Sequence, residues 1–216
     1  MSDNMNIFLL LIGSFFVGSI PFGLLLVRLA GKGDVRSVGS GNIGATNVVR
    51  AGGKWLGILT MVLDASKGFF PVFLARHFEF FGFGGAEISL AALAAVVGHM
   101  FMPWLRFKGG KGVATTLGAA LAFNPWMILP SLGVFMLTVA LTRYVSLGSI
   151  LGALTLPIFL LFVLFKGDST DLAMIFIVWT VLALLVIIKH YANIKRLLNG
   201  AENPLWGKQR KGKTDE

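Results

Sequence analysis

The 216-residue chain contains no cysteine and little charge. Without cysteine it can form no disulfide, no thiolate metal site and no acyl intermediate on a thiol. Lys, Arg, Asp and Glu make up only 13% of the residues, against about 25% in soluble domains, whereas 56% are hydrophobic and the mean hydropathy is +0.80. This composition predicts an integral membrane protein.

Acidic residues are the scarcer charged type, with 10 Asp and Glu against 19 Lys and Arg. The resulting net charge of +9 is not typical of a nucleic-acid-binding protein here, because the basic residues lie in short loops between apolar runs. We therefore expect no nucleic-acid partner, and anionic lipids or phosphorylated substrates instead. The few carboxylates do not cluster among the basic loops, so we expect neither a metal nor another cofactor.

Six apolar runs are long enough to cross a hydrocarbon layer of roughly 30 Å as helices. They occupy residues 5–28, 55–76, 86–105, 125–141, 146–165 and 172–190. A seventh run, at 112–123, is short for a full crossing. We count it as a crossing, because six crossings would move Arg143 and the basic tail away from the earlier basic loops. As a consequence, the loops at 31–54, 106–112, 142–149 and 190–204 share one face of the membrane.

That face also collects most of the basic residues, whereas Arg76 and Lys166 fall on the other face with Asp3, Glu79, Glu87, Asp168 and Asp171. By the positive-inside rule the basic face is cytoplasmic. The sequence thus predicts an all-α membrane protein with seven transmembrane helices, one of them short, an outside N-terminus and a cytoplasmic C-terminus. Residues 1–206 form a single transmembrane domain, and residues 207–216 form a basic cytoplasmic tail.

The first of these loops is rich in glycine and in hydrogen-bond donors. Glycines let successive backbone N–H groups turn toward one anion, and hydroxyl, amide and guanidinium groups add donors around it. The candidate phosphate ligands are Ser40, Gly41, Asn42, Gly44, Ala45, Thr46, Asn47 and Arg50. Gly39, Gly41 and Gly44 match the dinucleotide-binding pattern, but a membrane helix precedes them where that pattern requires a strand. A plain glycine-rich connector is the alternative.

The second loop places Lys108, Gly109, Gly110 and Lys111 at the start of the short helix. Two ammonium groups beside the N-terminus of a helix oppose the helix dipole unless an anion binds between them. We therefore expect a bound phosphate here. The alternative is that both lysines only contact lipid headgroups.

The last two loops supply Arg143 and Ser146, and then His190, Asn193 and Arg196. If the last helix continues past the membrane surface, His190 and Asn193 lie one turn apart on the same face. Imidazole is a suitable proton acceptor near neutral pH, and an amide can orient a substrate oxygen. Both residues can also be simple interfacial anchors.

Three ionisable residues lie inside the apolar runs, away from their ends: Asp64, Lys67 and His99. Asp64 and Lys67 are spaced to pair across one helical turn, which lowers the cost of burying both charges. We expect a structural pair rather than a catalytic one. His99 either approaches the site or bonds a backbone carbonyl.

Three blocks, at residues 40–50, 98–115 and 190–202, resemble the signature regions of the bacterial membrane-embedded acyl-phosphate:glycerol-3-phosphate acyltransferases. The resemblance runs in order from Gly18 to Pro204, and Asp64 and Lys67 also fit it. It implies an enzyme of the bacterial inner membrane whose active site faces the cytoplasm.

The implied reaction transfers a fatty acyl group from acyl phosphate to the 1-hydroxyl of glycerol 3-phosphate, and yields lysophosphatidic acid and phosphate. The expected partners are these two substrates, membrane lipids and the enzyme that supplies acyl phosphate. Acyl phosphate is already activated, so no enzyme nucleophile is needed. The residues expected to act in catalysis are His190, Asn193, Lys108 and Ser146. An organophosphate transporter and a structural membrane subunit are the alternatives, and the donor-rich loops favour the enzyme.

Overall fold

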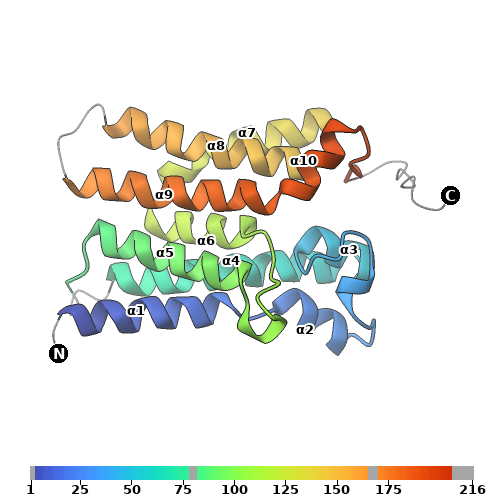
Figure 1. Ribbon diagram of the computed structural model, residues 1–216, viewed down its shortest axis with the longest axis horizontal. Helices are drawn as coiled ribbons and strands as arrows, with labels where there is room; N and C mark the ends of the chain where they lie inside the picture. The colour runs from blue at the N-terminus through green and yellow to red at the C-terminus, as the bar shows by residue number, and fades with distance from the viewer. Residues whose placement is uncertain (1–2, 78–81, 165–169, 206–216) are drawn as a thin grey trace.

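A computed structural model describes residues 3–77, 82–164 and 170–205, and these residues form helices joined by turns and loops, without a strand (Figure 1). The expectation of an all-α fold is confirmed. The helices are α1 (Asp3–Gly18), α2 (Phe22–Leu29), α3 (Ala45–Gly52), α4 (Lys54–His77), α5 (Gly85–Met100), α6 (Val113–Phe123), α7 (Pro125–Thr142), α8 (Val145–Leu164), α9 (Thr170–Lys189) and α10 (Tyr191–Leu198). Short 3-10 turns cover Val35–Ser37 and Pro103–Leu105.

Six stretches of the described chain are long and apolar enough to cross a membrane. They are Asn4–Leu29, Lys54–His77, Gly85–Leu105, Pro125–Thr142, Val145–Val163 and Asp171–Lys189. They coincide with the six long runs of the sequence, and the short run forms α6, so the protein is a multi-pass membrane protein. The crossing of α6 and the orientation of the bundle stay predictions.

The first apolar run, expected as one continuous helix, is broken between α1 and α2. Pro21 has no N–H to donate to the helix, and its ring interferes with the preceding turn. Two side chains satisfy the freed carbonyls: Lys67 Nζ donates to Ile20 O at 2.8 Å, and Trp104 Nε1 donates to Ser19 O at 2.9 Å. The break is thus held by α4 and by the turn after α5.

The short helix α6 packs closely along α4. A Cβ atom on Gly68 would collide with the carbonyl of Thr115, and one on Gly118 would collide with the carbonyl of Ala65. Arg76 at the end of α4 donates from Nη1 to Ala122 O at 3.1 Å. Because a guanidinium closes its last turn, α6 can end between its neighbours without unsatisfied carbonyls.

The helices form a bundle in which α7, α8 and α9 lie side by side along one edge, α1, α4 and α5 lie along the other, and α6 lies between them (Figure 1). Fully buried side chains such as Met100, Leu156, Trp179 and Leu182 fill the interior. The outward faces carry exposed Phe, Leu and Ile side chains, as lipid-facing helices do. Helices α2, α3 and α10 gather at the end opposite the N-terminus.

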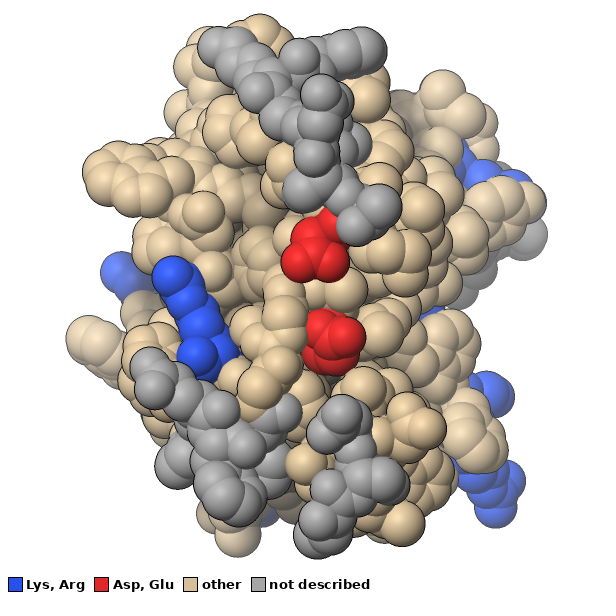
Figure 2. Space-filling model, turned by 90° about the vertical axis from the view of Figure 1, so that its left-hand side faces the viewer, with Lys and Arg blue, Asp and Glu red and all other residues tan. Residues whose placement is uncertain are grey.

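Acidic side chains mark the end of the bundle where the N-terminus lies (Figure 2). Glu87 and Asp171 flank Gly84 there, and Arg76 is the basic residue expected nearby. Of the other charged residues that the sequence assigned to this end, Glu79, Lys166 and Asp168 lie outside the described residues. The tail at 207–216, expected on the opposite face, also lies outside them.

The contact between α4 and α6 predicts that one glycine-to-alanine change destabilises the protein and that a second, outside this contact, does not. Gly118→Ala forces a methyl group against the α4 backbone, which we expect to cost about 1–3 kcal/mol. At about 2–4 °C per kcal/mol, the melting temperature in detergent should fall by several degrees. Gly133→Ala is the control, because a Cβ there meets no atom within 4 Å. An equal effect of the two changes would contradict this packing.

Candidate active site

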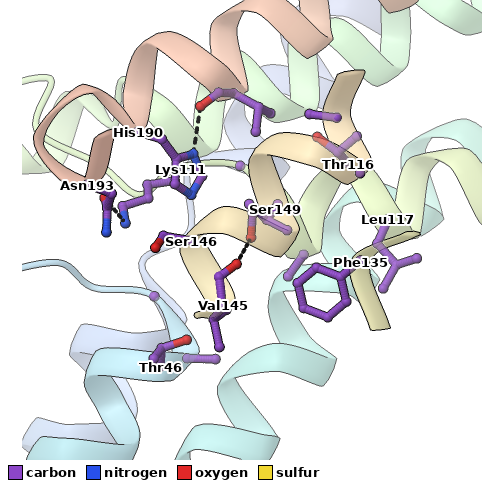
Figure 3. A pocket seen from close by; sticks show the side chains of 18 of the residues that line it. Thr46, Lys111, Thr116, Leu117, Phe135, Val145, Ser146, Ser149, His190 and Asn193 are labelled. Carbon is purple, nitrogen blue, oxygen red and sulfur yellow. Dashed lines mark hydrogen bonds between the residues drawn. The ribbon is translucent and has the colours of Figure 1, made fainter. Parts of the chain in front are cut away.

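A cavity of about 380 Å³ opens between the loop before α3, the start of α6 and helices α7 to α10 (Figure 3). Twelve of the residues proposed from the sequence line it: Ser40, Asn42, Gly44, Ala45, Thr46, Asn47, Arg50, Lys111, Ser146, His190, Asn193 and Arg196. Its deeper wall is apolar and includes Leu117, Ile128, Phe135, Leu156 and Leu182. The fold therefore brings residues from all four polar loops around one space.

A buried carboxylate, Glu202, connects the groups at the polar end. Its Oε1 accepts hydrogen bonds from Ser146 Oγ at 2.9 Å and from Asn193 Nδ2 at 2.8 Å. Its Oε2 pairs with Arg196 Nε at 2.8 Å. Glu202 belongs to the last signature block of the sequence, where no role was predicted for it. The signal was available, because it is the one acidic residue in the strongly basic segment 190–213.

Lys111 is the lysine of the second loop that faces the cavity. Its Nζ donates to Asn193 Oδ1 at 2.6 Å (Figure 3). Burial lowers the pKa of Lys111 to about 8; the Glu202 charge opposes this shift, and the Arg196 and Arg50 charges add to it. The ammonium is therefore still mostly protonated at neutral pH, but it loses its charge a little above it.

His190 lies between the end of α9 and the start of α10. The last long helix thus ends at Lys189 rather than continuing past the membrane surface. Asn193 nevertheless follows His190 within one turn, and both side chains face the cavity (Figure 3). The carbonyl of Val186 lies 2.8 Å from Nδ1 and can only accept, so Nδ1 carries the proton and Nε2 keeps a lone pair. Burial, with the Lys111 charge, lowers the pKa of His190 to about 4, against the Val186 hydrogen bond and the Glu202 charge. The imidazole is neutral at pH 7.

Asn47 stabilises the conformation of the first loop. Its Nδ2 lies 2.8–2.9 Å from the carbonyls of Val35, Val38 and Asn42, and its Oδ1 accepts from the backbone N–H of Ser40 at 3.0 Å. These contacts use the donors that the sequence analysis assigned to phosphate. The side chains of Ser40, Thr46 and Arg50 make no such bonds within the described chain, which leaves them for a ligand.

Five of the proposed residues do not line the cavity: Gly41, Lys108, Gly109, Gly110 and Arg143. The N–H groups of Gly109 and Gly110 already donate to Met100 O and His99 O, at 3.2 and 3.0 Å, so they offer no amide cradle. Lys108 and Arg143 are exposed. Lys111, three residues later, lies just before α6 and lines the cavity.

The expected pair within α4 is present, with Lys67 Nζ 2.8 Å from Asp64 Oδ1 and both side chains buried. His99 Nδ1 lies 3.7 Å from the same carboxylate oxygen. Within the described chain the His99 ring bonds no carbonyl, and His99 lines the cavity together with Asp64, which is the first of the two alternatives expected from the sequence. Within the described residues no three His, Asp or Glu side chains converge on a point that could hold a metal ion.

Comparison with known proteins identifies the family. The profile described as glycerol-3-phosphate acyltransferase matches residues 8–200. The chain belongs to this family. The glycerol-3-phosphate acyltransferase of Syntrophotalea carbinolica is 44% identical over 92% of this chain and 97% of its own, and that of Brucella canis is 46% identical over 92% of each. The family resemblance seen in the sequence is thereby confirmed, and the chain is an acyltransferase rather than a transporter or a structural subunit.

Two crystal structures of PlsY, an integral membrane glycerol 3-phosphate acyltransferase, share the fold. The glycerol 3-phosphate form is 39% identical, with a TM-score of 0.80 over 94% of this acyltransferase and 96% of PlsY. The lysophosphatidic acid form is 38% identical, with a TM-score of 0.76 over 92% and 95%. Helices and connections alike are therefore shared along nearly the whole chain.

The pKa of Lys111 predicts the alkaline side of the pH profile. If turnover needs the charged ammonium, activity should fall as the pH rises through about 8, because deprotonation removes the charge. Lys111→Arg keeps a charge at every accessible pH and should lose this fall, even if it is slower overall. Lys54→Arg, at an exposed lysine, is the control. An unchanged alkaline fall in Lys111→Arg would assign the titration to another group.

Proposed function

We propose that this acyltransferase moves a fatty acyl group from acyl phosphate to the 1-hydroxyl of glycerol 3-phosphate and releases lysophosphatidic acid and inorganic phosphate. The observation that carries the proposal is the continuity of the cavity, whose cationic end at Arg50 and Lys111 opens into an apolar interior. Phosphate groups and an acyl chain need these two environments side by side. The relatives, and the glycerol 3-phosphate and lysophosphatidic acid forms of PlsY, support the acceptor and the product.

The phosphate groups would bind where donors remain unused. Arg50 can bind phosphate through two parallel hydrogen bonds, and Ser40 and Thr46, which carry hydroxyls, line the same cavity. Lys111 would face the second phosphate or the developing oxyanion, where a preorganised charge lowers the barrier. Lys108 and Arg143, expected here from the sequence, lie outside this cavity, so we assign them no contact.

His190 would orient the attacking hydroxyl by accepting its hydrogen bond at Nε2. With a pKa of about 4 the imidazole is too weak a base to keep the proton. In the balanced reaction, the glycerol oxygen bonds to the carbonyl carbon, the bond from that carbon to the phosphate oxygen breaks, and the proton ends on the released phosphate. A phosphate oxygen is thus the better final acceptor, and catalysis rests on positioning and charge.

Asn193 and Ser146 would act mainly through their neighbours. Asn193 accepts from Lys111 and donates to Glu202, so it fixes the ammonium rather than the hydroxyl. Ser146 donates a hydrogen bond from its hydroxyl to Glu202, and its oxygen can accept one from a ligand in the cavity. A second Asn193 Nδ2 proton is left over for a substrate oxygen.

Turnover by the purified protein tests the proposal. With acyl phosphate and labelled glycerol 3-phosphate, the protein in detergent should form labelled lysophosphatidic acid without acyl-CoA. Arg50→Ala and Lys111→Ala should each lower kcat/KM at least tenfold, about 1.4 kcal/mol of transition-state binding. Arg106→Ala, at an exposed arginine outside the cavity, should not. A folded protein without product would refute the reaction, and near-normal Arg50→Ala and Lys111→Ala would refute the residue roles.

We also propose that the site faces the cytoplasm of a bacterial inner membrane, where an acyl-phosphate-supplying enzyme can reach it. The basic loops around the cavity support this orientation through the positive-inside rule. Because the chain has no cysteine, single cysteines report topology cleanly. In intact cells an impermeant thiol reagent should label Gly84→Cys and spare Lys54→Cys, and permeabilisation should expose both. The reverse pattern would invert the bundle.

A further inference from the structure

The loop that carries Lys111 rests directly on the ring of His99. The backbone N–H of Gly110 donates to the carbonyl of His99 at 3.0 Å, and the preceding Gly109 bonds Met100. A Cβ atom on Gly110 would overlap the Nε2 side of the His99 imidazole. Only a residue without a side chain lets the backbone lie this close to the ring. The imidazole of His99 therefore sets how closely this loop approaches α5.

The ring rests in turn on the ion pair inside the bundle. His99 Nδ1 faces Asp64 Oδ1 at 3.7 Å, and this nitrogen has no hydrogen-bond partner in the described chain. Asp64 pairs with Lys67, whose ammonium also donates to Ile20 O at the break between α1 and α2. All three side chains are about 97–98% buried. Burying charges in a bilayer is costly, and packing alone could join these helices without them.

These contacts form an unbroken path from the bundle interior to the active-site lysine. Asp64 supports the His99 ring, the ring supports Gly110, and the next residue, Lys111, reaches Asn193. Resting on the proposed function, we propose that Asp64 and His99 are positioning residues that set the place of the Lys111 ammonium relative to the reacting phosphate. A misplacement of about 1 Å can cost about a hundredfold in rate.

The titration of Lys111 reports its position independently of turnover. The charged groups that face the ammonium are Arg50 from α3, with Arg196 and Glu202 from α10 and the segment after it, and neutral His190 is close by. Since burial is the main cause of the lowered pKa, a lysine pushed toward solvent should titrate at a higher pH. Competitive acetylation of the Lys111 amine across pH, read by mass spectrometry, measures this in the intact protein.

A size swap across the contact tests the proposal. Gly110→Ala should lower kcat at least tenfold and raise the Lys111 midpoint by about one pH unit, because the new methyl group lifts the loop off the ring. His99→Ala removes the ring, so the double variant His99→Ala/Gly110→Ala should recover to within about threefold of His99→Ala alone. A merely structural role would make the two losses add. His77→Ala, at an exposed histidine, and Gly133→Ala are the matched controls.

The outcomes separate cleanly. Wild-type kinetics and titration in Gly110→Ala, or a double variant as slow as Gly110→Ala, would overturn the proposal. Should Gly110→Ala not fold, His99→Ala decides alone: it must lower kcat and shift the Lys111 midpoint, and a folded His99→Ala that does neither overturns the proposal. If the unchanged protein forms no product, the proposed function fails, while the Lys111 midpoints still test the positioning.

Discussion

The polar end of the cavity depends on the hydrogen bonds and the ion pair that the buried carboxylate of Glu202 makes with its neighbours. The carboxylate accepts hydrogen bonds from Ser146 on α8 and Asn193 on α10, and it pairs with Arg196. Through Asn193 it also reaches Lys111, at the end of the loop into α6. A carboxylate inside a membrane protein is tolerated only when its lone pairs are used, and here its neighbours use them. One anionic group therefore assembles side chains from separate helices.

That arrangement leaves other groups available for chemistry. Because Glu202 neutralises part of the positive charge, Lys111 and Arg50 can lie near one cavity without a permanent anion between them. The neutral His190, fixed through Nδ1, offers a lone pair rather than a charge. In the proposed reaction the protein thus supplies orientation and a cationic field, and the activated acyl phosphate supplies the driving force for transfer. Such a division suits an enzyme without a nucleophilic thiol.

The sequence predicted the helices better than it predicted the contacts. Apolar runs gave every long helix because bilayer thickness fixes their length, but hydropathy does not register the break that Pro21 introduces. Residue type showed that Asn47 is rich in donors, yet its partners are carbonyls of its own loop. Two lysines three positions apart look equivalent in sequence, whereas in the structure Lys108 is exposed and Lys111 reaches Asn193 in the cavity. The sequence shows that residue 202 is a glutamate in a basic segment, but only the fold shows which hydrogen bonds its carboxylate accepts.

Kinetics of Glu202→Gln test most directly whether this carboxylate assembles the site. Glutamine keeps the shape but presents an NH₂ group and no charge to its partners, so buried donors are left unpaired. We expect kcat to fall at least tenfold in detergent-purified protein that still elutes as the folded form, and Glu87→Gln, at the opposite end of the bundle, to leave it unchanged. Near-normal turnover by Glu202→Gln would contradict the account.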